Sequence, residues 1–234
     1  MTAMSDTAAT AAISTAAREL HLPTVRAEHT RLAEIAVRER QSHPVFLAEV
    51  LAAEVDDRAE RRRVRRINAA KFPRIKRLSE FNVDAVPSIQ PAQLAALTSG
   101  AYIDAGEPVV LLGDSGTGKT HLLIALGLAA CEQGRRVRYT TCAQLVNELV
   151  EAADERTLSR VVGRYGRLDL LLLDELGYVQ IDPRGAELLV QIITEREERA
   201  AIVDRVTFNA HILETGTNSY RLRTTRTRTR PKTT

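Results

Sequence analysis

The chain has 234 residues, a formal net charge of +3 and no tryptophan. This length suits one medium-sized domain plus a smaller one, with leucine, valine, isoleucine and alanine forming most of the core. No uncharged apolar stretch is long enough to cross a bilayer, so we expect no membrane partner. The two cysteines, Cys131 and Cys142, are not spaced as C-x-x-C, which favours reduced, buried thiols in a cytoplasmic protein.

The N-terminal third is expected to comprise a tail and a helical module. Residues 1–20 are rich in alanine, threonine and serine but lack a basic start followed by an apolar core. We therefore expect a disordered tail there rather than a signal peptide. An amphipathic pattern then predicts a helix over 24–40, and Pro44 begins a second apolar helix face. Residues 21–90 are interpreted as a helical N-terminal module with a basic arm, and 91–220 as the main domain.

Basic residues are concentrated in two segments. Between Arg58 and Arg77 there are ten basic residues and one acidic residue, and residues 221–234 have six basic residues and no acidic one. The rest of the chain has 17 basic and 29 acidic residues, and this asymmetry favours a polyanionic partner such as nucleic acid. The alternatives are a solvated helix face for the first segment and a flexible basic tail for the second. The predicted phosphate contacts are Arg61, Arg62, Arg63, Arg65, Arg66, Lys71, Arg74, Lys76 and Arg77.

Residues 113–120, with the sequence GDSGTGKT, fit the phosphate-binding loop pattern G-x-x-x-x-G-K-[ST] at every fixed position. An apolar run over 109–112 precedes the loop as a predicted strand, and helical periodicity follows it. Backbone N–H groups at the helix N-terminus are suited to triphosphate oxygens. Lys119 is expected to reach the β- and γ-phosphates, and the Thr120 hydroxyl to hold Mg²⁺. The predicted nucleotide ligands are Gly113, Asp114, Ser115, Gly116, Thr117, Gly118, Lys119 and Thr120.

A second motif follows about fifty residues later. The apolar run 168–173 predicts a strand buried on both faces, and it ends in Asp174 and Glu175, the Walker B pattern. In open α/β sheets a carboxylate at the carboxyl end of a central strand lies beside the phosphate loop. We expect Asp174 to contact Mg²⁺ through the water shell of the ion, and Glu175 to polarise the attacking water in catalysis.

Strand and helix signals alternate around these two motifs. Residues 137–140 read as a strand, and Thr141 with Gln144 forms a capping box for the helix that follows. Asp154 is a candidate cap for another helix, and Asp182 followed by proline is a strong helix start. Alternation of this kind predicts an α/β fold whose parallel strands are joined by right-handed crossovers.

From about His21 onward, the chain resembles the IstB-like ATP-binding proteins, the ATPase helpers of bacterial insertion-sequence transposition. The resemblance is carried by the phosphate loop and by the stretches 61–81, 173–178, 182–187 and 204–223. It implies a P-loop NTPase fold of the AAA+ class, similar to the replicative helicase loaders. It also implies a cytoplasmic location, ATP with Mg²⁺, oligomerisation on duplex DNA, and a partner transposase that is delivered to target DNA.

Two arginines acquire roles only through this resemblance. Arg205 matches the arginine finger that acts on the nucleotide of a neighbouring subunit, where a guanidinium neutralises charge developing on the γ-phosphate. Arg221 matches the second sensor, which contacts nucleotide bound to its own subunit. For each residue, the alternative is an ordinary surface arginine.

The chain departs from the family pattern after residue 200. The family has a further core strand there, whereas here residues 200–205 continue directly, and 183–208 contain no turn signal. We therefore expect the sheet to lack one core strand beside the strand that ends at Asp174. Without that strand, the adjacent strands would be exposed although their side chains are suited to burial on both faces. We therefore also expect impaired ATP hydrolysis.

Three functions remain open on the sequence alone. The first is a DNA-dependent ATPase that places a transposase on target DNA. The second is an ATP-binding adaptor or remnant that does not hydrolyse ATP, and the third is a helicase-loading factor of replication. Turnover raised by duplex DNA separates the first from the second, and capture of transposase or of replicative helicase separates the first from the third.

Overall fold

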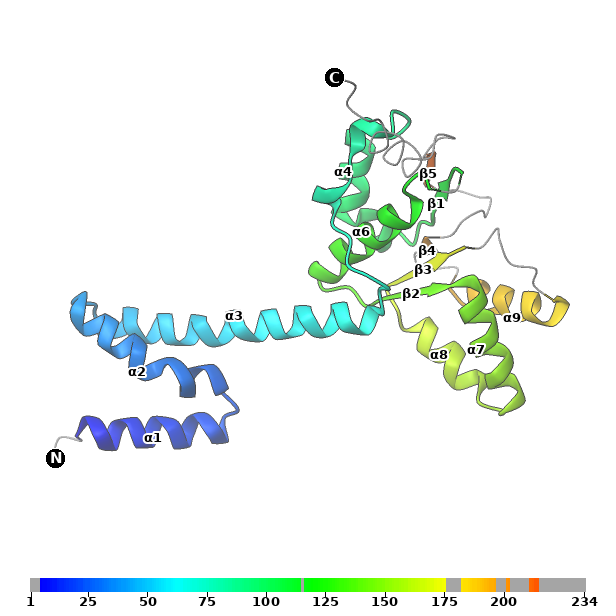
Figure 1. The fold of residues 1–234 in the computed structure, drawn as a ribbon. Helices are drawn as coiled ribbons and strands as arrows, with labels where there is room; N and C mark the ends of the chain where they lie inside the picture. The colour runs from blue at the N-terminus through cyan, green and yellow to red at the C-terminus, as the bar shows by residue number, and fades with distance from the viewer. Residues whose placement is uncertain (1–4, 115, 176–181, 197–200, 203–210, 215–234) are drawn as a thin grey trace, which may run out of the picture. The chain divides into compact units, whose positions relative to one another are not determined.

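The computed structural model describes residues 5–114, 116–175, 182–196, 201–202 and 211–214 (Figure 1). The chain divides into two compact units, Met1–Val64 and Arg65–Thr234. The helical module therefore ends well before residue 90, where the sequence placed its boundary. Side chains from the segment before residue 90 pack against the core of the second unit: Ile67, Phe72, Leu78, Phe81 and Val83.

The first unit is helical, as expected. Its helices are α1 (Asp6–Glu19), α2 (Pro23–Arg38) and most of α3 (His43–Ala70), which continues into the second unit. The α2 bounds agree with the helix expected over 24–40. A small apolar cluster of buried residues holds these helices together, formed by Ala17, Val25 and Val50 with Leu22, Leu32 and Phe46 packed against it.

Helix α1 corrects the expectation of a disordered tail over residues 1–20. The Ser5 hydroxyl accepts a hydrogen bond from the N–H of Ala8, and so caps the helix. Alanine has the highest intrinsic helix propensity, and Ala17 is buried in the apolar cluster of the first unit. The alanine-rich composition that suggested disorder therefore also favours a helix, provided that one helix face packs against the apolar cluster of the first unit.

The start of α2 is capped from a neighbouring helix. Leu22 precedes the helix and supplies no side-chain cap. Instead, Oε2 of Glu54 on α3 accepts hydrogen bonds from the N–H groups of Thr24 at 2.8 Å and Val25 at 3.1 Å. Glu54 is only 3% exposed, and its other oxygen accepts from Arg58 at 2.8 Å. A buried carboxylate thus satisfies backbone donors that the first turn of α2 leaves unpaired.

A five-stranded sheet forms the centre of the second unit (Figure 1). Its order is β2-β3-β4-β1-β5, and every recorded pair is parallel. The strands are β1 (Val109–Leu112), β2 (Val137–Thr141), β3 (Leu170–Asp174), β4 (Ala201–Ile202) and β5 (His211–Glu214). The helices are η1 (Leu78–Glu80), η2 (Val83–Ala85), α4 (Pro91–Ser99), α5 (Ala101–Asp104), α6 (Lys119–Glu132), α7 (Cys142–Asp154), α8 (Leu158–Gly166) and α9 (Pro183–Thr194).

The expectation of a missing core strand is wrong for this sheet. Ala201 and Ile202 form β4, which lies between β3 and β1, so the central position is filled. The strand has only two residues, whereas β1 and β5 have four each and β3 has five. A strand this short gives no readable period-2 pattern, and for this reason the sequence did not reveal it.

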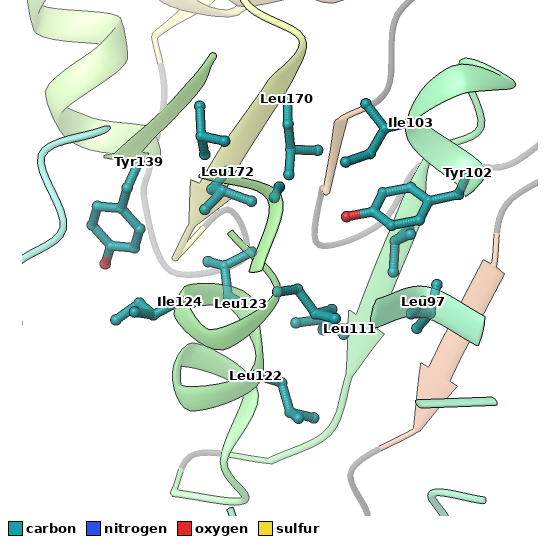
Figure 2. Packing of buried hydrophobic residues seen from close by; sticks show 14 of the residues in the cluster. Leu97, Tyr102, Ile103, Leu111, Leu122, Leu123, Ile124, Tyr139, Leu170 and Leu172 are labelled. Carbon is teal, nitrogen blue, oxygen red and sulfur yellow. The ribbon is translucent and has the colours of Figure 1, made fainter. Parts of the chain in front are cut away.

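Strand β3 supplies both hydrophobic cores of the second unit. Leu170 and Leu172 belong to the cluster on the side of α4 and α6, which Figure 2 shows from close by. Leu171 and Leu173 belong to the cluster on the side of α7, α8 and α9. Successive side chains of a strand point to opposite faces, so an uninterrupted leucine run is what a strand covered on both faces requires.

None of the described helices is both long enough and apolar enough to span a membrane. The free cysteines, Cys131 and Cys142, are both buried. This confirms the expectation of buried thiols.

Candidate nucleotide-binding site

The loop between β1 and α6 has the backbone geometry of an anion-binding site. Gly116 and Gly118 have φ values of +81° and +101°, which side-chain-bearing residues rarely adopt. Gly118 is the residue before α6 and gives that helix no side-chain cap. The first-turn N–H groups of α6 therefore remain available to a bound anion, at the positive end of the helix dipole.

Two loop side chains brace the loop from within. Thr117 is 1% exposed, and its hydroxyl donates to the carbonyl of Asp114 at 2.8 Å. The ammonium of Lys119 donates to the carbonyls of Gly113 at 2.6 Å and Asp114 at 2.7 Å. Lys119 therefore lies folded over the loop. The exposed Thr120 follows it in the first turn of α6, whereas the predicted ligand Ser115 lies outside the described residues.

Asp174 and Glu175 lie at the carboxyl edge of the sheet, which is the edge that carries the phosphate loop. Asp174 is the last residue of β3, and the loop follows directly after β1, which runs parallel to β3 across β4. The carboxyl ends of parallel strands meet at one edge, so the structure brings the two motifs together as expected. Glu175 is exposed and has a φ of +63°, an unusual value for a residue with a side chain. Strained backbone of this kind is often found at functional sites.

The carboxylate of Asp174 is held on both sides. The Tyr139 hydroxyl donates to Oδ2 of Asp174 at 2.9 Å, and the N–H of Glu175 donates to Oδ1 at 3.0 Å. The sequence analysis missed Tyr139, because its role depends on the register between β2 and β3. One relevant signal was present in the sequence: Tyr139 lies near the carboxyl end of one predicted strand, and Asp174 lies at the carboxyl end of the other.

The irregular segment around Phe81 lies directly against the phosphate loop. A side chain at Gly118 would meet the Phe81 ring at 2.9 Å. The Phe81 ring also packs edge-on against His121, with ring centres 5.3 Å apart, and His121 Nε2 lies 2.9 Å from the carbonyl oxygen of Arg77. The segment that follows the basic residues thus lies against Gly118 of the loop, and the last basic residue, Arg77, contacts the first turn of α6.

The basic residues of the predicted DNA contact do not all have the same surroundings. Arg61 is paired with Asp57, and Arg63 with Glu60 at 2.7 Å, both within the first unit. Hydrogen bonds from Thr24 and then from Arg61 lower the pKa of Asp57, and a hydrogen bond from Arg63 lowers the pKa of Glu60. In the second unit, Nε of Arg66 donates to the carbonyl of Cys131 at 2.9 Å, and Arg77 is 3.6 Å from the carboxylate of Glu132. Other members of the set are exposed: Arg62, Arg65, Lys71 and Arg74.

The donor set fits Mg²⁺ held jointly by protein and phosphate. Within the described ranges, no three His, Cys, Asp or Glu side chains cluster closely enough to hold a metal ion by themselves. Mg²⁺ is usually bound through one or two carboxylates together with substrate phosphates. One ordered carboxylate, Asp174, beside an uncapped helix N-terminus is an arrangement of that kind. The residues assigned by resemblance alone, Arg205 and Arg221, lie outside the described residues.

The chain is similar in sequence to several known proteins. A putative insertion sequence ATP-binding protein of Sinorhizobium fredii is 34% identical, over 88% of this chain and 77% of that protein. The putative ATP-binding protein of insertion sequence IS5376 from Geobacillus stearothermophilus is 33% identical, over 79% of this chain and 73% of that protein. Among solved structures, AMPPCP-bound DnaA from Aquifex aeolicus matches with 26% identity and a TM-score of 0.45, over 58% of this chain and 43% of that chain.

The family itself is recognised over most of the chain. The profile described as "IstB-like ATP binding protein" matches residues 15–203, which include the phosphate loop, the Asp174–Glu175 motif and β4. The chain therefore belongs to the family of IstB-like ATP-binding proteins.

Proposed function

We propose that the chain binds ATP with Mg²⁺ at the carboxyl edge of the sheet, and acts on duplex DNA as a helper that places a partner transposase. The observation that carries this proposal is the uncapped start of α6 after a glycine loop, with Lys119 folded over that loop. Neutral ligands gain little from such a site, whereas a triphosphate gains backbone hydrogen bonds, the helix dipole and an ammonium together.

Each residue of the site has one task. The loop N–H groups bind the β- and γ-phosphates, and Lys119 exchanges its carbonyl partners for phosphate oxygens. Thr120 and Asp174 hold the ion, which when bound neutralises phosphate charge. The Glu175 carboxylate accepts a hydrogen bond from the attacking water. The water oxygen then bonds to the γ-phosphorus as the bond to the β-phosphate oxygen breaks, which gives ADP and phosphate.

A second candidate function is an ATP-binding adaptor whose turnover is negligible. The sequence suggested impaired hydrolysis from a missing core strand, but β4 lies between β3 and β1. On its other side, β3 is paired along its full length with β2, up to Asp174. The two candidate functions are therefore separated by a measurement of turnover.

The binding proposal is tested by calorimetry on the full chain. ATP with Mg²⁺ is expected to bind, whereas AMP is expected to bind at least about 100-fold more weakly, because the β- and γ-phosphates supply the charge-assisted contacts. Equal affinity for AMP and ATP would contradict a triphosphate site. Turnover with and without duplex DNA, compared with Glu175→Gln, then separates an ATPase from a non-hydrolysing adaptor.

DNA contact is proposed for the basic segment, and exposed residues of the second unit provide its test. Reversing the charge of Lys71 and Arg74 together is expected to weaken duplex binding at every sequence. The plot of log affinity against log salt should also become shallower by about 0.9 per lost contact. Arg160→Glu, on exposed α8 surface, is the matched control and should change neither quantity. An unchanged slope in the double variant would remove this segment from the interface.

The partner and the assembly come from the family relationship. We propose oligomers on duplex DNA in the cytoplasm, with Arg205 acting on the nucleotide of a neighbouring subunit and Arg221 on the subunit's own nucleotide. Co-purification with a transposase, rather than with replicative helicase, is the expected result. Capture of replicative helicase alone would instead favour the helicase-loading function.

A further inference from the structure

The hydroxyl of Tyr139 on β2 reaches the carboxylate at the end of the adjacent strand β3, which is expected to support the metal ion. Tyr139 lies opposite Leu172 in the register of β2 and β3, and Thr141 lies opposite Asp174. The Tyr139 side chain therefore extends along the strands by about two residues to place its oxygen 2.9 Å from Oδ2 of Asp174. Side chains in strands lean along the strand direction, and a tyrosine is long enough to span this offset.

The body of Tyr139 is fixed, so the position of its hydroxyl is fixed as well. Tyr139 is 8% exposed and belongs to the core cluster between the sheet and α6. Figure 2 shows its ring at the margin of that cluster, next to Leu172. Burial, and next the hydrogen bond to Asp174, raise the pKa of the Tyr139 hydroxyl well above its ordinary value. The group is thus a neutral donor throughout the physiological range of pH.

The two hydrogen bonds to Asp174 leave part of the carboxylate available. Each oxygen of an ionised carboxylate can accept about two hydrogen bonds. Oδ2 uses one for the Tyr139 hydroxyl and Oδ1 uses one for the N–H of Glu175. Both torsions of the side chain are thereby restrained. With the hydrogen bonds from the described residues counted, each oxygen can still accept one from a water molecule around an ion.

We propose that Tyr139 is a positioning residue, which orients the Asp174 carboxylate toward the metal ion of bound ATP. This inference rests on the Mg·ATP site proposed above. Groups that orient metal-supporting side chains typically contribute 10- to 100-fold to metal affinity or activity. Because Asp174 is expected to act through metal-bound water, the contribution of Tyr139 should lie near the lower end of that range.

The chain provides a matched control. Tyr165 on α8 is 1% exposed, and its hydroxyl donates to Oε2 of Glu148 on α7 at 2.6 Å. Its pKa is also raised, to about 12, first by burial and then by that hydrogen bond. Tyr165 is therefore a second buried tyrosine bonded to a carboxylate, but it belongs to the cluster on the opposite side of the sheet from α6.

The experiment is a titration of Mg²⁺ into the full chain with a fluorescent ATP analogue at fixed concentration. Tyr139→Phe should raise the Mg²⁺ concentration at half-maximal binding by about 10-fold and leave affinity in excess EDTA unchanged. Tyr165→Phe should leave the Mg²⁺ midpoint where it is in the wild type. In an Asp174→Asn background, adding Tyr139→Phe should have no further effect, since the tyrosine acts through the aspartate.

The outcomes separate this inference from the function on which it rests. If wild-type chain binds the analogue but Tyr139→Phe shifts the midpoint no more than Tyr165→Phe does, the positioning role is wrong and the nucleotide site stands. An equal loss of affinity in EDTA would identify Tyr139 as merely structural. Wild-type chain that binds no nucleotide at any Mg²⁺ concentration would overturn the proposed function and this role together.

Discussion

The helices of this protein begin in two different ways. Helix α7 has a complete capping box, in which the Thr141 hydroxyl accepts from the N–H of Gln144 and the Gln144 side chain accepts from the N–H of Thr141. Helix α9 has an aspartate cap, with Oδ1 of Asp182 accepting from the N–H of Gly185 at 2.6 Å. Helix α6 begins after Gly118 with no side-chain cap at all. Helices α4 and α8 also begin without a side-chain cap, so α6 differs from them in that its open first turn follows a glycine loop and carries Lys119.

Removing the lysine at the open helix start should have the largest effect on ATP affinity. Lys119→Ala is expected to weaken Mg·ATP binding by about 10- to 150-fold, because a hydrogen bond to a charged group contributes roughly 1.5–3 kcal/mol. Calorimetry measures this loss directly. Without nucleotide, the free energy of unfolding should change by less than about 1 kcal/mol, since the surface around Lys119 is partly solvated. Undiminished binding in a folded variant would show that the phosphates lie elsewhere.

A methyl group at the open start should affect both stability and binding. Gly118→Ala places a side chain at a φ of +101° and against the Phe81 ring, which lies 2.9 Å from the new Cβ position. Strain and overpacking together should cost about 2–4 kcal/mol in the free energy of unfolding. ATP affinity should fall as well, because the loop must move.

The control for this variant is at the other end of the same helix. Gly134 has a φ of +94°, and a Cβ there would meet nothing within 4 Å. Gly134→Ala should therefore cost only about 1 kcal/mol and leave ATP affinity unchanged. Denaturant melts of both variants isolate the contribution of Phe81. Equal destabilisation by the two substitutions would mean that the Phe81 ring moves aside with no cost in the free energy of unfolding.

The start of α2, capped by Glu54, should show a dependence on acid. Burial opposes ionisation of Glu54, but hydrogen bonds from Arg58 and from the N–H groups of Val25 and Thr24 outweigh it and lower the pKa below 4.5. A lowered native pKa means that the stabilisation is complete above about pH 4.5 and is lost as pH falls through the native value. Glu54→Gln should cost about 1–3 kcal/mol at pH 7 and less at pH 3.

The control for Glu54 is an exposed carboxylate in the same unit. Glu28 pairs with Arg31 at 2.7 Å on the surface of α2, where ion pairs contribute about 0–1 kcal/mol. Glu28→Gln should thus change the pH profile of unfolding little. A pH profile for Glu54→Gln that parallels wild type would show that the carboxylate does not stabilise the helix start.

The smallest effect is expected at a closed helix start. Asp182→Ala removes the cap of α9 and should cost about 1 kcal/mol, while ATP affinity remains unchanged. Asp182→Asn retains a side-chain oxygen for the N–H of Gly185 and should recover most of the loss. Thermal melts measure the change in stability of both variants, and titration calorimetry measures their ATP affinity. A fall in ATP affinity with Asp182→Ala would show that the capped start of α9 affects the nucleotide site at the uncapped start of α6.

Local sequence patterns predicted the parts of the site that depend on neighbouring residues. The strand and helix on either side of the phosphate loop, the strand that ends at Asp174, and the caps Thr141 and Asp182 are all confirmed, because a few adjacent residues determine each one. Asp154 was expected to cap a helix, but α7 ends at that residue and Thr157 precedes α8 without a side-chain cap. Several polar residues can precede a helix, and only the local backbone decides between them.

Contacts between distant segments could not be predicted in this way. The bond between Tyr139 and Asp174 depends on strand register, and the contact of Phe81 with Gly118 depends on how an irregular segment folds back. Strand β4 has too few residues to produce a pattern. The sequence therefore predicted the composition of the site, whereas the interactions that orient it required the arrangement of the whole second unit.

Helix α6 links the two ligands expected for this protein. Its open end is the proposed nucleotide site. The basic segment contacts the same helix at two points, where His121 meets the Arg77 carbonyl and where Arg66 donates to the Cys131 carbonyl. If both proposed sites bind their ligands, a shift of this helix that ATP favours also moves the proposed DNA surface. By linkage, the factor by which bound ATP raises the affinity for DNA must equal the factor by which bound DNA raises the affinity for ATP.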